Sequence, residues 1–349
     1  MRKIDVFNHI LPDAYVTRMN EVAPAFKDTG KRMRGVPMLR DLGERFRVMD
    51  LFGPEYQQIL SIATPPIEAY ANPSDAVGLA QRANDGMAEL VQQYPERFPG
   101  FIASMPLNNI DGTLAEIERA IGLLGARGIQ IFSNIAGKPL DAPEFLPMFD
   151  AMAKHDLPIW LHPYRGADHA DFASEDQSMY EIWWTFGWPY DTSAAMARMV
   201  FSGLFDRLPN LKIITHHMGA MAPYFEGRLG PGMDQLGART SDRDYSEVLK
   251  RLKKRPLDYF KMFYGDTALF GAYDATVCGL AFFGVDHVLF ASDAPFDPEK
   301  GPMYIRETIA IVDRLPITTD ERERIYFKNA QGLLKLHTDE TTKDTKGTE

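Results

Sequence analysis

The chain has 349 residues, with 38 Lys and Arg against 48 Asp and Glu, so its net charge is −10. This charge disfavours nucleic acid and anionic membranes as partners, and no apolar run approaches the roughly 18 residues of a membrane span. The single cysteine, Cys278, permits no internal disulfide. Because no signal-peptide pattern begins the chain either, we expect a cytoplasmic globular protein.

Eight short apolar runs rich in β-branched residues recur along the chain, and helical patterns separate them. Runs that are apolar throughout, rather than alternating, are typical of parallel strands covered on both faces. Helices are expected at 74–93 and 111–124, the second with Leu114, Ile117 and Ile121 at helical spacing. This alternation predicts an α/β fold, a (β/α)8 TIM barrel. The predicted strands are 4–9, 58–62, 100–104, 128–132, 158–162, 211–216, 262–265 and 288–292.

One domain, residues 1–336, accommodates all eight strands, and two regions are additions to the barrel. Residues 13–45 form a charged insertion after the first strand, and the polar residues 337–349 are expected to be a disordered tail. The rival fold, a doubly wound sheet, would need a glycine-rich phosphate loop after the first strand. Segment 8–12 reads Asn-His-Ile-Leu-Pro and has no glycine, which favours the barrel.

Polar side chains gather at the predicted C-terminal ends of the strands, where a barrel builds its pocket. Four of the eight histidines lie there, His9, His162, His216 and His217, together with Asp293. His9, His162 and Asp293 would bind one divalent ion such as Zn²⁺ and leave a position open for water or substrate. His217 would be free to move protons beside the ion. A single histidine is more simply a structural residue, but four at strand ends favour a metal site.

Several segments match the motifs of a known family. Segment 5–12 resembles the strand-1 motif D-x-H-x-H of the amidohydrolase superfamily. The later segments resemble one branch of it, the aminocarboxymuconate-semialdehyde and γ-resorcylate decarboxylases, whose strand-8 motif T/S-D-x-P-F is similar to 291–296. The similarity spans almost the whole chain, because the matching segments are 5–12, 45–50, 94–98, 162–164, 217–228 and 291–296.

The resemblance implies that His9, His162 and Asp293 are metal ligands and that His217 transfers protons, with Asp293 as a second proton donor. Phe7 is a departure, because it stands where relatives have a His or Glu as the first metal ligand, and a phenyl ring cannot bind metal. Either three protein ligands and waters hold the metal, as is common for catalytic zinc, or the site works without metal. Phe7 could also form an apolar wall against an aromatic substrate.

Two arginines and a second histidine complete the implied site. Arg45 and Arg228 match arginines that meet a substrate carboxylate, and a guanidinium suits this group because it forms paired hydrogen bonds with it. Arg228 would reach across the interface of a homodimer. His216, directly before His217, is the less suitable candidate for proton transfer.

Segment 180–190 holds three of the four tryptophans. Tyr180, Trp184 and Trp188 are spaced four apart, which is typical of the buried stripe of a helix. Aromatic residues are also enriched in pockets and interfaces, so Trp183 and Trp184 are candidates for contact with the substrate. Both interpretations stay open.

The predicted fourth strand ends without a lysine, the nearest being Lys138. A carboxylated lysine at this place is typical of the binuclear hydrolases of the superfamily, so a two-metal hydrolase is disfavoured. The resemblance implies instead a non-oxidative decarboxylase of a small aromatic or unsaturated carboxylic acid. It would use one divalent metal ion, Zn²⁺ as first choice and Mn²⁺ as the alternative, and no organic cofactor. His217 or Asp293 would protonate the carbon that loses CO₂.

Two other functions stay open. A hydrolase or hydratase on the same scaffold would open a lactone or ring with metal-activated water, and uptake of solvent oxygen instead of release of CO₂ would reveal it. A binding protein with a degraded metal site is the third, suggested by Phe7. Metal analysis and the turnover of a His217→Ala variant would test that reading.

Overall fold

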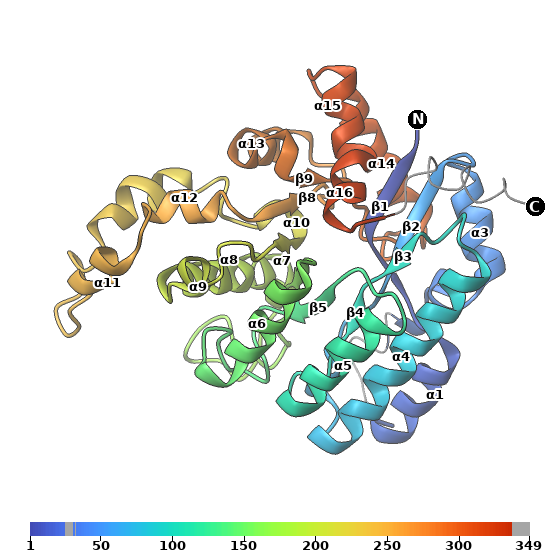
Figure 1. Ribbon diagram of the computed structural model, residues 1–349, viewed down its shortest axis with the longest axis horizontal. Coiled ribbons are helices and arrows are strands. Elements are labelled where there is room, and N and C mark those ends of the chain that lie inside the picture. Colours follow the sequence, from blue (N-terminus) through green and yellow to red (C-terminus); the bar gives the residue numbers. More distant parts are fainter. Residues whose placement is uncertain (25–30, 32, 337–349) are drawn as a thin grey trace, which may run out of the picture.

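The computed structural model describes residues 1–24, 31 and 33–336. A ring of short parallel strands lies at its centre, and helices surround it (Figure 1). All eight predicted strands form, although Ile102 divides the one at 100–104 into two. In the described residues the strands are β1 (Lys3–Ile10), β2 (Tyr56–Ile62), β3 (Gly100–Phe101), β4 (Ala103–Ser104), β5 (Ile129–Phe132), β6 (Ile159–His162), β7 (Ile213–Thr215), β8 (Tyr264–Asp266) and β9 (Val288–Leu289).

Backbone hydrogen bonds close this ring. Strands β1 to β3 pair in chain order, and so do β4 to β9. The N–H of Ile102, between β3 and β4, donates to Leu60 O of β2 at 2.8 Å and continues the sheet across the division. At the other seam the N–H of Val6 donates to Phe290 O at 3.0 Å, and the N–H of His9 donates to Ala294 O at 2.8 Å. The first strand thus pairs with the segment after the last, and the predicted barrel is confirmed.

Helices lie outside the strands, and two of them, Pro73–Gln93 and Ile110–Gly122, follow β2 and β4. Asn72 and Asn109 begin them, because their side chains accept backbone N–H groups of the first turn. Both predicted helices are found within two residues of their expected bounds. The described helices are α1 (Asp13–Val22), α3 (Leu42–Asp50), α4 (Pro73–Gln93), α5 (Ile110–Gly122), α6 (Leu146–His155), α7 (Ile182–Thr185), α8 (Gly187–Phe201), α9 (Leu204–Arg207), α10 (His216–Gly219), α11 (Ser246–Arg251), α12 (Pro256–Phe260), α13 (Tyr273–Phe283), α14 (Pro302–Arg314), α15 (Thr319–Glu323) and α16 (Asn329–Leu333).

The expected insertion at 13–45 is described only in part. Helix α1 lies along α4 (Figure 1), and Arg18 of α1 forms an ion pair with Asp75 of α4 at 2.6 Å. Residues 25–30 and 32 of the insertion lie outside the described residues, and so does the predicted tail at 337–349. Among the described helices, none has both the length and the apolar character needed to cross a membrane.

The inside of the barrel is filled by a buried apolar cluster to which most strands contribute. Trp160 of β6 and Ile214 of β7 lie in it and are 1% and 0% exposed. Successive side chains of a strand point to opposite faces, so the residues two positions further on, His162 and His216, point inward as well. The polar residues at the strand ends therefore lie on this apolar layer.

Candidate active site

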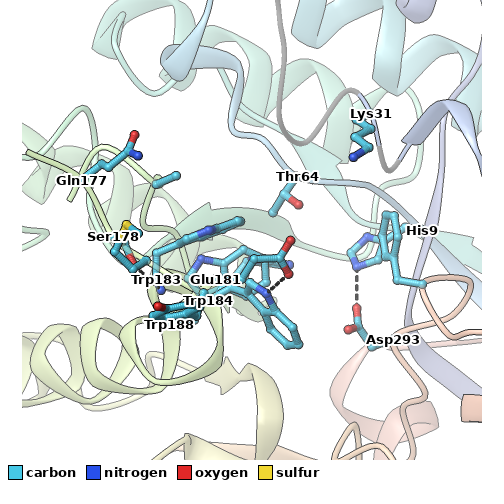
Figure 2. Close-up of a pocket in the computed structure, with 15 residues that line it drawn as sticks. His9, Lys31, Thr64, Gln177, Ser178, Glu181, Trp183, Trp184, Trp188 and Asp293 are labelled. Carbon is cyan, nitrogen blue, oxygen red and sulfur yellow. Dashed lines mark hydrogen bonds and ion pairs between the residues drawn. The ribbon is translucent and has the colours of Figure 1, made fainter. Parts of the chain in front are cut away.

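The four histidines and the aspartate at the strand ends meet at one place. His9 ends the inward face of β1, His162 ends β6, and Asp293 follows β9. His9 Nε2 lies 3.0 Å from Asp293 Oδ1 (Figure 2), and His216 Nε2 lies 3.3 Å from the same oxygen. A ligand nitrogen of each of His9, His162 and His216 lies within 4.8 Å of the other two.

The other ring nitrogen of each histidine has a partner that can only accept a hydrogen bond. Nδ1 of His9 and of His162 lies 3.2 Å and 2.6 Å from a backbone carbonyl oxygen. Nδ1 of His216 lies 2.6 Å from the Asp266 carboxylate. With its proton on Nδ1, a neutral ring would turn its Nε2 lone pair toward a cation at the centre of the cluster. Metal-binding histidines are commonly oriented in this way.

Burial and charge set the ionisation of the cluster. Burial lowers the pKa of His9 and of His162, so both rings stay neutral near pH 7. Burial opposes ionisation of Asp293, but the nearby rings of His216 and His9 hold the pKa of that carboxyl well below its usual range. Burial would lower the pKa of His216 as well, yet the Asp266 and Asp293 carboxylates raise it to about 9.

These residues fit a divalent cation. Nε2 of His216 is buried and makes no well-formed hydrogen bond within the described part of the chain, although Asp293 lies near it. A buried polar atom without a partner is costly, and a cation would satisfy it. Neutral imidazoles and one carboxylate are donors suited to Zn²⁺ and also to Mn²⁺. His9, His162 and Asp293, the predicted ligands, all contribute atoms to this group.

His217 lies beside the cluster on an unusual turn. Its φ is 55°, and that of Met218 is 54°, so two successive residues are left-handed. The ring centroid of His217 lies 3.8 Å from that of His216, and Nδ1 of His217 lies 2.6 Å from Ala268 O. Burial and the neighbouring charge on His216 lower the pKa of His217 to about 4. The ring is therefore neutral near pH 7, and Nε2 is free to exchange a proton.

A cavity of about 500 Å³ opens above the cluster. We call His9, His162, His216 and Asp293 the floor; three of them, His9, His162 and Asp293, line the cavity. Trp183, Trp184 and Trp188 form the aromatic wall opposite the floor (Figure 2). A second cavity of about 180 Å³ contains His217 and shares two residues of the wall and Asp293 with the first. His217 therefore borders a space next to the first cavity. Thr64, Lys31, Glu181 and Phe296 also line the larger cavity.

The aromatic residues of 180–190 do not form a buried helical stripe. Tyr180 is 91% exposed, and Trp184 and Trp188 belong to different helices, α7 and α8. Tyr180 and Glu181 are left-handed, with φ of 54° and 60°, so no continuous helix runs through them. The interpretation as a buried helical stripe was wrong because the backbone is left-handed at these two residues. The structure places Trp183 and Trp184 in the cavity wall.

Phe7 does not line the cavity, contrary to the wall predicted there. Its ring is fully buried and lies 3.9 Å from the ring of His216 and 5.0 Å from that of His9, between centroids. The phenyl ring therefore packs against the histidines from within the barrel. A substrate in the cavity cannot reach it without moving them.

Arg45 is also absent from the cavity. It is fully buried, and its guanidinium donates to Asn8 Oδ1 at 3.1 Å, to Gln58 Oε1 at 2.6 Å and to the backbone oxygen of His9. The prediction that Arg45 contacts a substrate carboxylate is therefore corrected. This arginine holds the end of β1 in place. Arg228 lies exposed on the surface beside Phe225, so its predicted contact across a dimer stays a prediction.

Some residues of the site had a weak signal in the sequence, or none. Asp266 and His216 both end predicted strands, but the hydrogen bond between them depends on the pairing of β7 with β8. Lys31 belongs to the insertion and reaches the cavity through tertiary structure alone. Among the described residues that line the larger cavity, it is the one with a permanent positive charge.

Comparison with known proteins agrees with this site. The chain matches the family model described as amidohydrolase over residues 4–336. It is 33% identical to a 2-amino-3-carboxymuconate-6-semialdehyde decarboxylase of Dictyostelium discoideum, over 80% of this chain and 72% of that protein. It is 32% identical to a γ-resorcylate decarboxylase of Polaromonas sp., over 84% of this chain and 87% of that protein.

Solved structures give the same result. A dihydroxybenzoic acid decarboxylase of Polaromonas sp., with bound manganese and the inhibitor 2-nitroresorcinol, matches with a TM-score of 0.77 and 27% identity, over 97% of this chain and 98% of that one. A 5-carboxyvanillate decarboxylase of Novosphingobium aromaticivorans, complexed with manganese and a nitrobenzoic acid, has a TM-score of 0.77 and 26% identity, over 96% of each chain. The resemblance inferred from the strand-end motifs is thus confirmed along almost the whole chain, which belongs to the amidohydrolase family.

Proposed function

We propose that this protein is a metal-dependent decarboxylase that removes CO₂ from a small aromatic carboxylic acid without oxidation. The observation that carries the proposal is the floor of histidines and Asp293 facing an aromatic wall, with His217 beside it. The relatives in sequence and in structure are named as decarboxylases of such acids.

The cavity can hold a planar ring in one orientation. Trp183 and Trp184 offer flat apolar surfaces for the ring. Lys31 lies where its ammonium could pair with a carboxylate. A divalent cation held by His9, His162 and Asp293 supplies Lewis-acid attraction for an oxygen substituent of the ring. Together these groups would direct the carbon that bears the carboxylate toward His217.

The reaction then needs one proton and no redox partner. Nε2 of His217 or the carboxylate of Asp293, both unprotonated in the free protein near pH 7, would first take up a proton from water and then deliver it to the ring carbon that bears the carboxylate. The bond from this carbon to the carboxylate breaks, its electron pair restores the aromatic ring, and CO₂ leaves. The proton donor recovers its proton from water. Positioned proton transfer of this kind contributes about 10²–10⁴-fold to a rate.

Two finer points belong to the same proposal. Zn²⁺ is the predicted ion because imidazole nitrogens suit it, and Mn²⁺ is the alternative because both solved relatives contain it. We also propose a homodimer in which exposed Arg228 reaches the cavity of a second copy. Sedimentation of the purified protein, with an Arg228→Ala variant, tests the second point, because a monomer with unchanged KM would contradict it.

The test of the function is metal-dependent release of CO₂. Protein stripped with a chelator and reloaded with Zn²⁺ or Mn²⁺ is incubated with 2,6-dihydroxybenzoate and with 5-carboxyvanillate, and CO₂ and the decarboxylated phenol are measured. We expect turnover only after reloading. Ring or lactone opening without CO₂ would favour the hydrolase or hydratase. If the protein showed neither metal binding nor turnover, the third function, a binding protein with a degraded metal site, would be favoured.

A further inference from the structure

We propose that His216 is a protein ligand of the metal and takes the place of the ligand that Phe7 cannot provide. The inference rests on the proposed function, because it assumes that the floor binds a cation. It adds His216 to the predicted ligands His9, His162 and Asp293. The additional ligand would thus come from the end of β7 and not from position 7 of the first strand.

The positions of the two side chains support this exchange. Phe7 fills a buried position within the cluster, and its ring lies 3.9 Å from His216 and 5.6 Å from His162, between centroids. The phenyl ring therefore occupies space among the histidines without offering a donor. His216 approaches the same centre, with a ring nitrogen within 4.8 Å of those of His9 and His162.

The far side of His216 is built as that of a metal ligand. Its Nδ1 donates to Asp266 Oδ2 at 2.6 Å, and Asp266 is fully buried. The other oxygen of Asp266 accepts the backbone N–H groups of His217 at 3.0 Å and Ala268 at 3.1 Å. Asp266 is thus fixed by the backbone and in turn fixes the ring, so it is a positioning residue. A carboxylate–histidine pair of this kind is typical behind a metal-bound imidazole.

The near side of His216 is unsatisfied. Its Nε2 is buried and makes no well-formed hydrogen bond among the described residues. Asp293 Oδ1 lies 3.3 Å away and already contacts His9 at 3.0 Å. A cation between these groups would bring all of them into contact with one positive charge. The competing explanation is a protonated His216 that bridges two carboxylates and never meets the metal.

X-ray absorption of the wild-type protein loaded with one Zn²⁺ separates these explanations without any mutation. The spectrum counts the imidazole rings bound to the ion. We expect three, from His9, His162 and His216. Two rings would overturn the proposal and leave the proposed function intact. A wild-type protein that retains no metal would overturn the proposed function as well.

Metal affinity of variants gives a second test, measured in metal buffers by the metal content of the protein. Asp266→Asn is expected to weaken binding by about 10–100-fold, as for other residues behind a metal ligand. His216→Ala removes the ligand itself and is expected to weaken binding more than Asp266→Asn does. His155→Ala is the matched control, because His155 lies on α6 and its ring bonds only to Glu118 among the described residues.

The exchange itself can be reversed. In the His216→Ala background, Phe7→His places an imidazole back on the first strand and is expected to restore most of the lost affinity. Phe7→Leu in the same background keeps an apolar side chain and should restore none. Equal affinity in wild type and His216→Ala would contradict the proposal. If His216→Ala does not fold, the count of rings in the wild type decides.

Discussion

The floor and the aromatic wall of the cavity face the same substrate but come from different kinds of backbone. The floor stands at the ends of paired strands, and its residues are 1–8% exposed and held by hydrogen bonds. The wall stands on α7 and the first turn of α8, where Trp183 and Trp184 are half-buried and the preceding Glu181 is left-handed. A rigid site for chemistry is thus combined with a wall that the strands do not constrain.

This difference suggests a division of labour. Changes in or beside the floor should alter metal binding, turnover or folding, because each floor side chain depends on several others. Changes in the wall should alter which substrate binds, because loops of a barrel carry specificity while strand ends carry chemistry. The following experiments test this division, beginning with the largest expected effect.

Replacing His217 tests the chemistry beside the floor. His217→Asn removes the Nε2 that exchanges the proton and should lower kcat by about 10²–10⁴-fold. Metal content should stay at the wild-type value, because the metal is held by other residues. Steady-state kinetics and metal analysis of the same preparation measure both. A fall in kcat of less than tenfold would mean that Asp293 transfers the proton alone.

Replacing Arg45 tests the support of the floor. Arg45→Met leaves Asn8, Gln58 and the His9 carbonyl without their buried partner, so the free energy of unfolding should fall by about 3–5 kcal/mol. Arg47→Met is the control on the same helix, because Arg47 is exposed and pairs only with Glu44 among the described side chains. Chemical denaturation measures both variants. A higher KM at unchanged stability would restore the substrate-binding role implied by the resemblance.

Much of the floor could be predicted from the sequence. Parallel strands buried on both faces give continuous apolar runs, and their ends must converge, so His9, His162 and Asp293 could be placed together before the fold was known. The division of the predicted strand 100–104 at Ile102 could not be predicted, because it depends on how neighbouring strands pair. Nor could the position of Arg45, since its partners come from three separate elements.

The wall was harder to predict for a physical reason. A spacing of four residues predicts a helix only if the backbone stays right-handed, and Tyr180 and Glu181 break that condition. The relation between Phe7 and His216 was also hidden, because the two residues come from β1 and the end of β7 and meet only in the closed barrel. Strand ends can be read locally, but contacts across the barrel cannot.

The buried carboxyl of Glu68, outside the floor, should make the stability of the protein depend on pH. The floor carboxylate, Asp293, is paired with histidines. Among the described residues neither oxygen of buried Glu68 has a hydrogen-bond partner, and burial raises the pKa of Glu68 to about 8. The unfolded chain ionises near the ordinary value of 4.5, so ionisation favours unfolding as pH rises from about 4.5 to 8. Glu68→Gln should therefore be more stable than wild type at pH 8, by roughly 2–4 kcal/mol, and similar at pH 4.5.

Thermal and chemical unfolding across this pH range measure the effect. Glu89→Gln is the control, because Glu89 is exposed on α4 and its replacement should change stability by less than about 0.5 kcal/mol at any pH. If the free energy of unfolding varied with pH in the same way for wild type and Glu68→Gln, the Glu68 carboxyl would ionise freely in the folded protein, which would contradict this prediction.

The wall itself should give the smallest effect. Trp184→Ala removes an apolar surface from the cavity and should raise KM by about tenfold, which corresponds to about 1.4 kcal/mol, while kcat and metal content change little. Tyr224→Ala is the control, because Tyr224 is 81% exposed and lies outside both cavities. Kinetics with two substrates of different ring substitution measure the change. An equal loss of kcat and metal would show that wall and floor act as one unit.

The origin of the atoms added to the product tests the central claim most directly. The metal-loaded protein is incubated with 2,6-dihydroxybenzoate in D₂O and, separately, in ¹⁸O-labelled water, and the product is analysed by mass spectrometry. Decarboxylation predicts one deuterium on the carbon that carried the carboxylate, one CO₂ released, and no ¹⁸O in the phenol. A product that carries ¹⁸O and keeps its carboxylate would contradict the account.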